Sequence, residues 1–411
     1  MTDTGRAMRL LHEAFRKEAA GQVHQALEHA LSALEGFSEA KDRTGAAAAH
    51  HLAGVLHARL DHLDEARDHL EMAVPLRLST GDTEGLAALH QQRFELALGV
   101  GDKALAQQAA TELVDLMRDT QDQAGESRAL HQLAQLCMNR GESEQAAALI
   151  TRGLELAESG QARAAFMALQ AQLDPSDGLA QAENALNVAR SAGSKAAVVG
   201  ALRTLADIEA GAGRLEDAHG HLEEALDALE LLRDEPQKAQ VLQQLAALEV
   251  SRGDKVGALD RMRYAARILG ELADLSGQLE ALHAAGELAM ELGRVPQALT
   301  LAAQQVELCG RLGDPAMLGA ARFVQGQRLV VAADLEAAAR AFSASAEQQA
   351  RAGLTEAEGI ALGMQGQVLA ALGHLEGAKE VLARGAQLLE SSGSASLADL
   401  RALQAEVEGL K

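Results

Sequence analysis

The sequence is poor in several residue types on which other classes of protein depend. Its 411 residues include no tryptophan, one tyrosine and two cysteines. With so few large aromatic rings, the chain lacks the stacking platforms that bind single-stranded nucleic acid. Two cysteines are too few for a four-ligand metal site, and Cys137 and Cys309 lie in distant repeats, so we expect no disulfide between them.

Basic residues are also scarce. The chain has 37 lysine and arginine residues against 59 aspartate and glutamate residues, which gives a net charge of −22. This balance argues against nucleic acid as a partner, because its phosphates attract clusters of basic residues. We expect the acidity to keep the chain in solution, or alternatively to steer a basic or cationic partner to its surface.

No apolar segment is long enough to suggest membrane insertion or secretion. The longest runs, such as residues 329–333, are far shorter than the roughly 20 residues that cross a bilayer. The N-terminal residues lead directly into an amphipathic pattern, without the apolar stretch of a secretion signal. The sequence therefore predicts a cytoplasmic protein that does not insert into a membrane.

Alanine, in contrast, recurs at a fixed interval along nearly the whole chain. Each of these alanines follows a turn residue by five positions, and successive alanines are 40 residues apart except for two steps of 36 around Asp177. The alanines are Ala26, Ala66, Ala106, Ala146, Ala182, Ala218, Ala258, Ala298, Ala338 and Ala378. The turn residues are Gly21, Asp61, Gly101, Gly141, Asp177, Gly213, Gly253, Gly293, Ala333 and Gly373. A fixed period of roughly 20 to 50 residues indicates a stacked repeat protein.

Each repeat has the pattern of two antiparallel helices joined by a short turn. Around Gly213, apolar residues recur at spacings of three and four, with Leu202 and Leu205 before the turn and Leu215 and Leu222 after it. Glycine suits the positive φ that is common where a helix ends. Two helices joined in this way form an αα-hairpin.

Small residues occupy two further positions of most repeats. Seven residues before the turn these are Ala14, Gly54, Ala134, Ala206, Ala246, Gly286, Gly326 and Gly366, with Phe94 and Gln170 as exceptions. Twelve residues after the turn these are Ala33, Ala73, Gly153, Ala189, Ala225, Ala265, Ser345 and Gly385, with Leu113 and Gln305 as exceptions. Short side chains let helix axes approach closely, so enlarging one should overpack the contact at a cost of roughly 1–3 kcal/mol.

This order of small residue, turn, alanine, bulky residue and small residue resembles the tetratricopeptide repeat (TPR). Leu133-Ala134, Leu205-Ala206 and Leu245-Ala246 match the Leu-Gly/Ala pair of that family. The resemblance covers residues 5 to about 390, in 40-residue units of an extended subclass that also occurs in the kinesin light chain and in bacterial peptide-sensing regulators. The large aromatic residues of the family's first helix are mostly replaced here by leucine or histidine.

The resemblance implies an all-α fold. We expect a right-handed superhelical α-solenoid of about ten TPR-like hairpins over residues 5–394, closed by a capping helix at 395–411. Residues 160–194 form an irregular unit, because the steps of 36 remove about one helical turn on each side of Asp177 and Pro175 ends its first helix. This unit is interpreted as a locally tightened superhelix or, alternatively, as a hinge.

In the TPR family the first helix of each hairpin lines a concave groove, so the resemblance also implies a row of groove residues. Ten residues before the turns these are His51, Gln91, His131, Arg203, Gln243 and His283. Six residues before the turns these are Glu95, Gln135, Asp207, Glu287, Gln327 and Gln367. Residues flanking the row are Arg59, Arg128, Asn139, Gln240 and Glu280. Such a polar row can hydrogen-bond to an extended peptide, although it can also be no more than a hydrated surface.

The sequence has no pattern that indicates catalysis or a cofactor. It contains no phosphate-binding loop after a strand, no nucleophile elbow and no H-E-x-x-H motif. Ten of the fourteen histidines precede residue 132, but a metal site needs three or four ligands that converge. We interpret these histidines as structural or solvated, with metal binding or pH sensing as the alternative, and expect no catalytic residue, no metal and no cofactor.

Three functions are compatible with this sequence. The first is a non-enzymatic scaffold or adaptor that binds a peptide or helix of a partner protein in the groove. The second is a peptide-sensing signalling regulator whose superhelix changes conformation when its ligand binds. The third is a self-assembling structural protein that associates through the apolar residues Met8, Leu11 and Phe15 of its first repeat.

Overall fold

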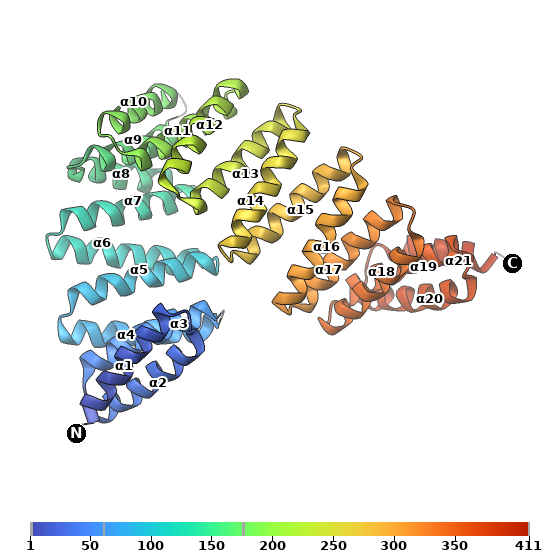
Figure 1. Ribbon diagram of the computed structural model, residues 1–411, viewed down its shortest axis with the longest axis horizontal. Coiled ribbons are helices and arrows are strands. Elements are labelled where there is room, and N and C mark those ends of the chain that lie inside the picture. Colours follow the sequence, from blue (N-terminus) through green and yellow to red (C-terminus); the bar gives the residue numbers. More distant parts are fainter. Residues whose placement is uncertain (1–2, 61, 175–176, 410–411) are drawn as a thin grey trace. The chain divides into compact units, whose positions relative to one another are not determined.

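The computed structural model describes residues 3–60, 62–174 and 177–409, and these residues form helices joined by short turns without any strand (Figure 1). The prediction of an all-α fold is confirmed for this part of the chain. The predicted turn residue Asp61 lies outside these ranges, as do Pro175 of the irregular unit and the last two residues of the predicted capping helix. No helix within these ranges is both long and apolar enough to cross a membrane.

The described residues contain 21 helices. The first eleven are α1 (Asp3–Ala19), α2 (Val23–Glu39), α3 (Arg43–Arg59), α4 (Leu63–Thr80), α5 (Thr83–Gly99), α6 (Lys103–Asp119), α7 (Gln123–Asn139), α8 (Ser143–Leu156), α9 (Gly160–Leu173), α10 (Gly178–Ser191) and α11 (Lys195–Gly211). The others are α12 (Leu215–Leu232), α13 (Glu235–Ser251), α14 (Lys255–Glu271), α15 (Leu275–Glu291), α16 (Val295–Leu312), α17 (Pro315–Val331), α18 (Leu335–Arg351), α19 (Thr355–Ala371), α20 (Leu375–Ser392) and α21 (Leu397–Gly409).

The chain divides into two compact units, Met1–Ile208 and Glu209–Lys411, which we call unit 1 and unit 2. In unit 1, α1 packs on α2, α3 on α4, and so on to α9 and α10. In unit 2, the same pairing joins α13 to α14 and continues to α19 and α20, with α21 packed on α20. The pairs are the predicted hairpins, whereas a continuous solenoid over 5–394 and a hinge at 160–194 stay predictions.

Left-handed backbone conformations end most of the first helices. Among the predicted turn residues that are described, Gly21, Gly101, Gly141, Gly213, Gly253, Gly293, Ala333 and Gly373 have φ between 59° and 83°. Asp177 differs, because it precedes α10 with a φ of −125°. The turns between hairpins need the same conformation, and at Lys41, Gln121, Arg233 and Ala273 a residue other than glycine adopts it.

Aspartate begins many of the helices. In the described chain, nine helices follow an aspartate whose side chain accepts a hydrogen bond from a backbone N–H of the first turn; these are Asp42, Asp82, Asp102, Asp122, Asp234, Asp254, Asp274, Asp314 and Asp334. Such a cap stabilises a helix by about 1 kcal/mol. The acidic composition is therefore partly explained by helix capping.

The ten repeated alanines are all fully buried, with 0% of their surface exposed. The small residues around them are also buried at most positions, and the glycines show why. A Cβ on Gly54 would lie 2.7 Å from Leu70, and one on Gly326 would lie 2.7 Å from Phe342. The predicted close approach of the two helices is confirmed at these contacts. Gln170 is an exception, because its side chain is exposed.

Candidate functional site

The first helices of successive hairpins approach one another in unit 1. Helix α1 contacts α3, α3 contacts α5, and α7 contacts α9. Helices α5 and α7 carry part of the predicted row, and α9 packs against α7, so the surface along these three helices is the place where residues of that row can act together. The geometry of this surface decides which of the predicted residues lie close enough to bind the same ligand.

Two neighbouring cavities lie along these three helices. One has a volume of about 740 Å³ and is lined from α7 by Arg128, His131 and Gln132, and from α9 by Ala162 and Phe166. The other has a volume of about 410 Å³ and lies between α5 and α7, with Gln91, Arg128 and Gln132 in its wall. Because Arg128 and Gln132 line both cavities, the two cavities are adjacent. We call the surface formed by Gln91, Arg128, His131, Gln132 and Phe166 the unit 1 groove.

Part of the lining of the unit 1 groove is apolar. Ala87 and Ala88 line it on α5, and Ala162 and Ala165 line it on α9. The ring of Phe166, which is 1% exposed, contacts the ring of His131 edge to face with centroids 5.5 Å apart. Burial lowers the pKa of His131, which keeps its imidazole neutral at physiological pH. A neutral imidazole both donates and accepts hydrogen bonds beside an apolar surface.

Arg128 supplies the positive charge of the groove. Its side chain is exposed, and within the described residues it makes no hydrogen bond or ion pair. Glu158 is a carboxylate in the wall of the larger cavity. The groove therefore combines apolar lining residues with a guanidinium and amide groups, an arrangement typical of sites that bind one ligand in a defined orientation.

Other predicted residues of unit 1 are used in contacts within the chain. His51 hydrogen-bonds to Arg77 over 3.3 Å, and burial together with this guanidinium lowers the pKa of His51 to about 4. Arg59 forms an ion pair with Glu18 at 3.6 Å. Gln91 donates a hydrogen bond to Glu95 over 2.9 Å. The contacts of His51 and Arg59 join different helices, whereas that of Gln91 lies within α5.

The remaining residues of the row in unit 1 are not brought together with the groove. Gln135 and Asn139 are exposed on α7 outside the cavity walls. Arg203 and Asp207 lie one turn apart on α11, where burial lowers the pKa of the arginine and raises that of the aspartate.

In unit 2 the predicted residues do not converge on one cavity of the described chain. Glu287 forms an ion pair with the buried Arg328 at 2.9 Å. Gln367 lines a mostly apolar cavity of about 280 Å³ beside α21. The side chains of Gln240, Glu280, His283 and Gln327 are exposed, and that of Gln243 is half-buried. None of the seventeen predicted groove residues is fully buried.

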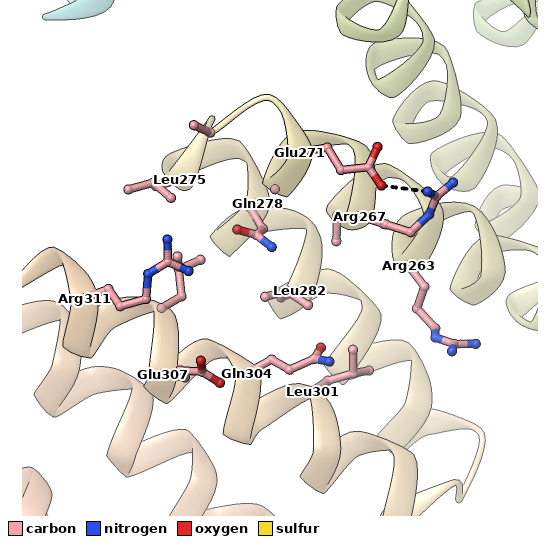
Figure 2. A pocket seen from close by; sticks show the side chains of 14 residues that line it. Arg263, Arg267, Glu271, Leu275, Gln278, Leu282, Leu301, Gln304, Glu307 and Arg311 are labelled. Carbon is pink, nitrogen blue, oxygen red and sulfur yellow. Dashed lines mark hydrogen bonds and ion pairs between the residues drawn. The ribbon is translucent and has the colours of Figure 1, made fainter. Parts of the chain in front are cut away.

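The sequence analysis missed a cavity of about 590 Å³ in unit 2 (Figure 2). It lies between α14, α15 and α16, and Arg263, Arg267 and Arg311 line it together with Glu307. Figure 2 shows Arg267 beside Glu271, to which it is ion-paired over 2.7 Å. Most of the residues that line this cavity belong to α14 and α16, the second helices of their hairpins. The predicted row includes residues of first helices only.

Within the described residues, His219, Glu223 and Glu249 of unit 2 form a group of side chains that can hold a metal ion. Their ligand atoms lie within 4.8 Å of one another. The sequence analysis did not identify this group, although the spacing of His219 and Glu223 by four residues on one helix was a usable signal.

Known structures share the fold of this chain at low sequence identity. The apo form of RapI aligns with a TM-score of 0.52 and 12% identity, over 69% of this chain and 82% of that protein. A tetratricopeptide repeat protein from Parabacteroides merdae aligns with a TM-score of 0.47 and 13% identity, over 64% of this chain and 93% of that one. Yeast Tom70 aligns with a TM-score of 0.41 and 12% identity, over 98% and 96% of the two chains.

No family model matches the sequence. No curated protein matches it either. The likeness therefore concerns the fold, and the site must be interpreted from its own residues.

Proposed function

Because the chain is a TPR-like helical repeat protein, we propose that it is a non-enzymatic scaffold or adaptor that binds a partner protein in the unit 1 groove. The ligand is an extended peptide segment or a helix of the partner. The observation that carries this proposal is the sharing of Arg128 and Gln132 by two cavities, which places two adjacent cavities along α5, α7 and α9.

The residues of the groove support distinct roles in binding. An apolar side chain of the ligand fills the space above Phe166 and Ala162, where burial of its surface provides affinity. Arg128 pairs with a carboxylate of the ligand, and the amides of Gln91 and Gln132 hydrogen-bond to its backbone. His131 stands between the apolar and polar parts and sets the position of the ligand.

The proposal is tested with peptides selected on the intact chain from a displayed random library. A selected peptide should bind the double variant Arg128→Ala, His131→Ala at least about tenfold more weakly, since loss of a central contact costs more than about 1 kcal/mol. The matched control is Gln327→Ala, Gln367→Ala, which removes two residues of the same predicted row from unit 2 and should leave the affinity unchanged. Equal binding to both variants would place the peptide site elsewhere.

A peptide-sensing regulator is the second candidate, and the shortened helices of the middle of the chain favour it. Helices α8, α9 and α10 have 14 residues each, whereas α7 and α11 have 17. Small-angle scattering with and without a selected peptide separates this function from that of a rigid scaffold.

Self-assembly through the first repeat has less support. Met8 and Phe15 are 41% and 46% exposed, but Leu11 is 6% exposed and belongs to the core formed by α1, α2 and α3. The predicted apolar contact is thereby reduced to two side chains. Light scattering over a range of protein concentrations tests whether they join two copies.

A further inference from the structure

A group of polar side chains in unit 2 connects three successive helices. His219 and Glu223 lie one turn apart on the same face of α12, and Glu249 lies near the end of α13. Nε2 of His219 is 3.3 Å from Oε1 of Glu249 and 3.8 Å from Oε1 of Glu223. Three possible ligand atoms thus meet at one point between two hairpins.

Glu249 is the unusual member of this group because it is buried. The residue is 3% exposed, and its Oε2 atom is enclosed without a hydrogen-bond partner in the described chain. Burial of a carboxylate is costly unless an opposite charge compensates it. The second oxygen of this carboxylate is thus not satisfied by the surrounding protein.

Arg261 of α14 compensates the charge only in part. Its Nε lies 3.3 Å from Oε1 of Glu249, and its Nη2 contacts Glu223. One guanidinium faces two carboxylates, so the group keeps a net negative charge while His219 is neutral. The side chains of Arg261 and His219 are 28% and 24% exposed, so solvent reaches the group and Arg261 has room to turn outward.

The preceding hairpin provides a comparison. There, Glu209 and His221 occupy the repeat positions that Glu249 and Arg261 occupy in the next hairpin, and they form a pair at 2.7 Å. That pair is not part of a converging group of three ligand-type side chains within the described residues. The two groups differ because of His219, which reaches from α12 to Glu249 of the following helix and so adds a third ligand-type side chain.

We propose that His219, Glu223 and Glu249 bind a divalent transition-metal ion such as Zn²⁺, and that Arg261 is the cation that occupies the group when no metal is bound. In tetrahedral zinc sites the metal–ligand distances of about 2.0–2.2 Å place neighbouring ligand atoms roughly 3.3–3.6 Å apart. The two distances from His219, 3.3 Å and 3.8 Å, are close to this separation. One imidazole and two carboxylates suit Zn²⁺ better than Mg²⁺, which prefers oxygen ligands alone.

Binding of the ion would displace the guanidinium of Arg261 toward solvent and neutralise both carboxylates. It would also join α12 to α13, which belong to successive hairpins, and so stabilise unit 2 against unfolding. Since only the folded chain brings the three ligands together, the melting temperature should rise with the metal concentration.

The test is calorimetric titration of the full chain with Zn²⁺ in the presence of excess Mg²⁺, which saturates weak acidic surface sites. The expected result is one tight site that His219→Ala weakens roughly 100-fold. His221→Ala is the matched control, because this histidine lies two residues away on α12 and pairs with Glu209 instead; it should keep the site. Equal binding to wild type and His219→Ala, or no tight site in wild type, would overturn the proposal.

Two further variants address folding and competition. Glu223→Gln changes a half-exposed ligand, so the variant should fold normally and lose most of its affinity for the ion. Arg261→Gln removes the competing cation and should bind Zn²⁺ at least as tightly as wild type. If Arg261→Gln abolishes binding while the circular dichroism spectrum stays native, the group is an ion-pair network and the proposal is wrong. Co²⁺ in place of Zn²⁺ should give a tetrahedral absorption spectrum in wild type and not in His219→Ala.

Discussion

The imidazole rings of His57 and His69 stack with their centroids 5.3 Å apart, at the repeat positions where Glu209 and His221 form a pair at 2.7 Å in a later hairpin. The first position lies four residues before the predicted turn residue, and the second lies eight residues after it. In unit 1 these two positions thus hold two histidines, which can both become positively charged. In unit 2 the same positions hold a glutamate and a histidine, which can have opposite charges. The two units should therefore respond differently to acid.

Lowering the pH should destabilise unit 1. Burial, with a smaller effect of His69, lowers the pKa of His50 to about 4, and burial also lowers the pKa values of His57 and His69 below the usual 6.5. At a pH between the lowered pKa of the folded chain and the usual 6.5 of the unfolded chain, the unfolded chain binds more protons than the folded chain. The free energy of unfolding should therefore be highest above pH 6.5 and should fall as the pH decreases toward 4, by about 3 kcal/mol for His50 alone.

Thermal unfolding followed by circular dichroism between about pH 7.5 and pH 5 measures this effect. His69→Gln should flatten the dependence of Tm on pH. The substitution removes one titrating histidine and also removes the repulsion between a protonated His69 and its neighbours His50 and His57. His374→Gln is the control, since His374 is exposed, and its curve should run parallel to that of wild type. A parallel curve for His69→Gln would rule out this histidine group as the cause.

Gly326→Ala should destabilise the chain by roughly 1–3 kcal/mol, because the added Cβ lies 2.7 Å from the ring of the fully buried Phe342. Gly220→Ala is the matched control within unit 2. It lies inside α12 with no heavy atom within 4 Å of the added Cβ, and alanine should stabilise the helix by up to about 1 kcal/mol. Urea denaturation measures both, and a loss of stability in Gly220→Ala would show that helix propensity is not the controlling factor there.

Arg93→Ala should lower the free energy of unfolding by about 3 kcal/mol. Arg93 is 3% exposed, lies 2.7 Å from Glu71, and also contacts Glu112 and His90. Its removal leaves two carboxylates without their buried cation. Arg351→Ala removes a solvent-exposed pair with Glu347 and should cost less than about 1 kcal/mol. Denaturant unfolding of the two variants gives the comparison, and similar losses would mean that the buried network contributes no more than a surface pair.

Cys137 and Cys309 should react with a thiol reagent only after unfolding. Both thiols are free and buried. Burial raises the pKa of Cys137 to about 11, with a further contribution from Glu142, and burial also raises the pKa of Cys309. The thiolate, which is the reactive form, is therefore rare at neutral pH. Labelling with a chromogenic disulfide should be slow in native buffer and complete in urea, and rapid labelling of the native chain would contradict this.

The local parts of the fold could be predicted because their requirements lie within one hairpin. A buried alanine such as Ala146 and a turn glycine such as Gly141 are selected by contacts and backbone conformations only a few residues away. The turns at Lys41 and Gln121 were less evident, because those residues adopt a positive φ without the glycine that usually marks it.

The repeat, the helical hairpins and the small residues between paired helices can all be predicted from spacing along the chain, since each depends on residues that are close in sequence. Which polar residues meet depends on the packing of helices in three dimensions. Of the predicted row, Gln91, Arg128 and His131 come together along α5, α7 and α9, and His219 meets Glu249 from a different hairpin. Such encounters depend on how successive helices cross. The angle at which successive helices cross results from packing between hairpins, so it cannot be predicted from the spacing of residues within a single hairpin.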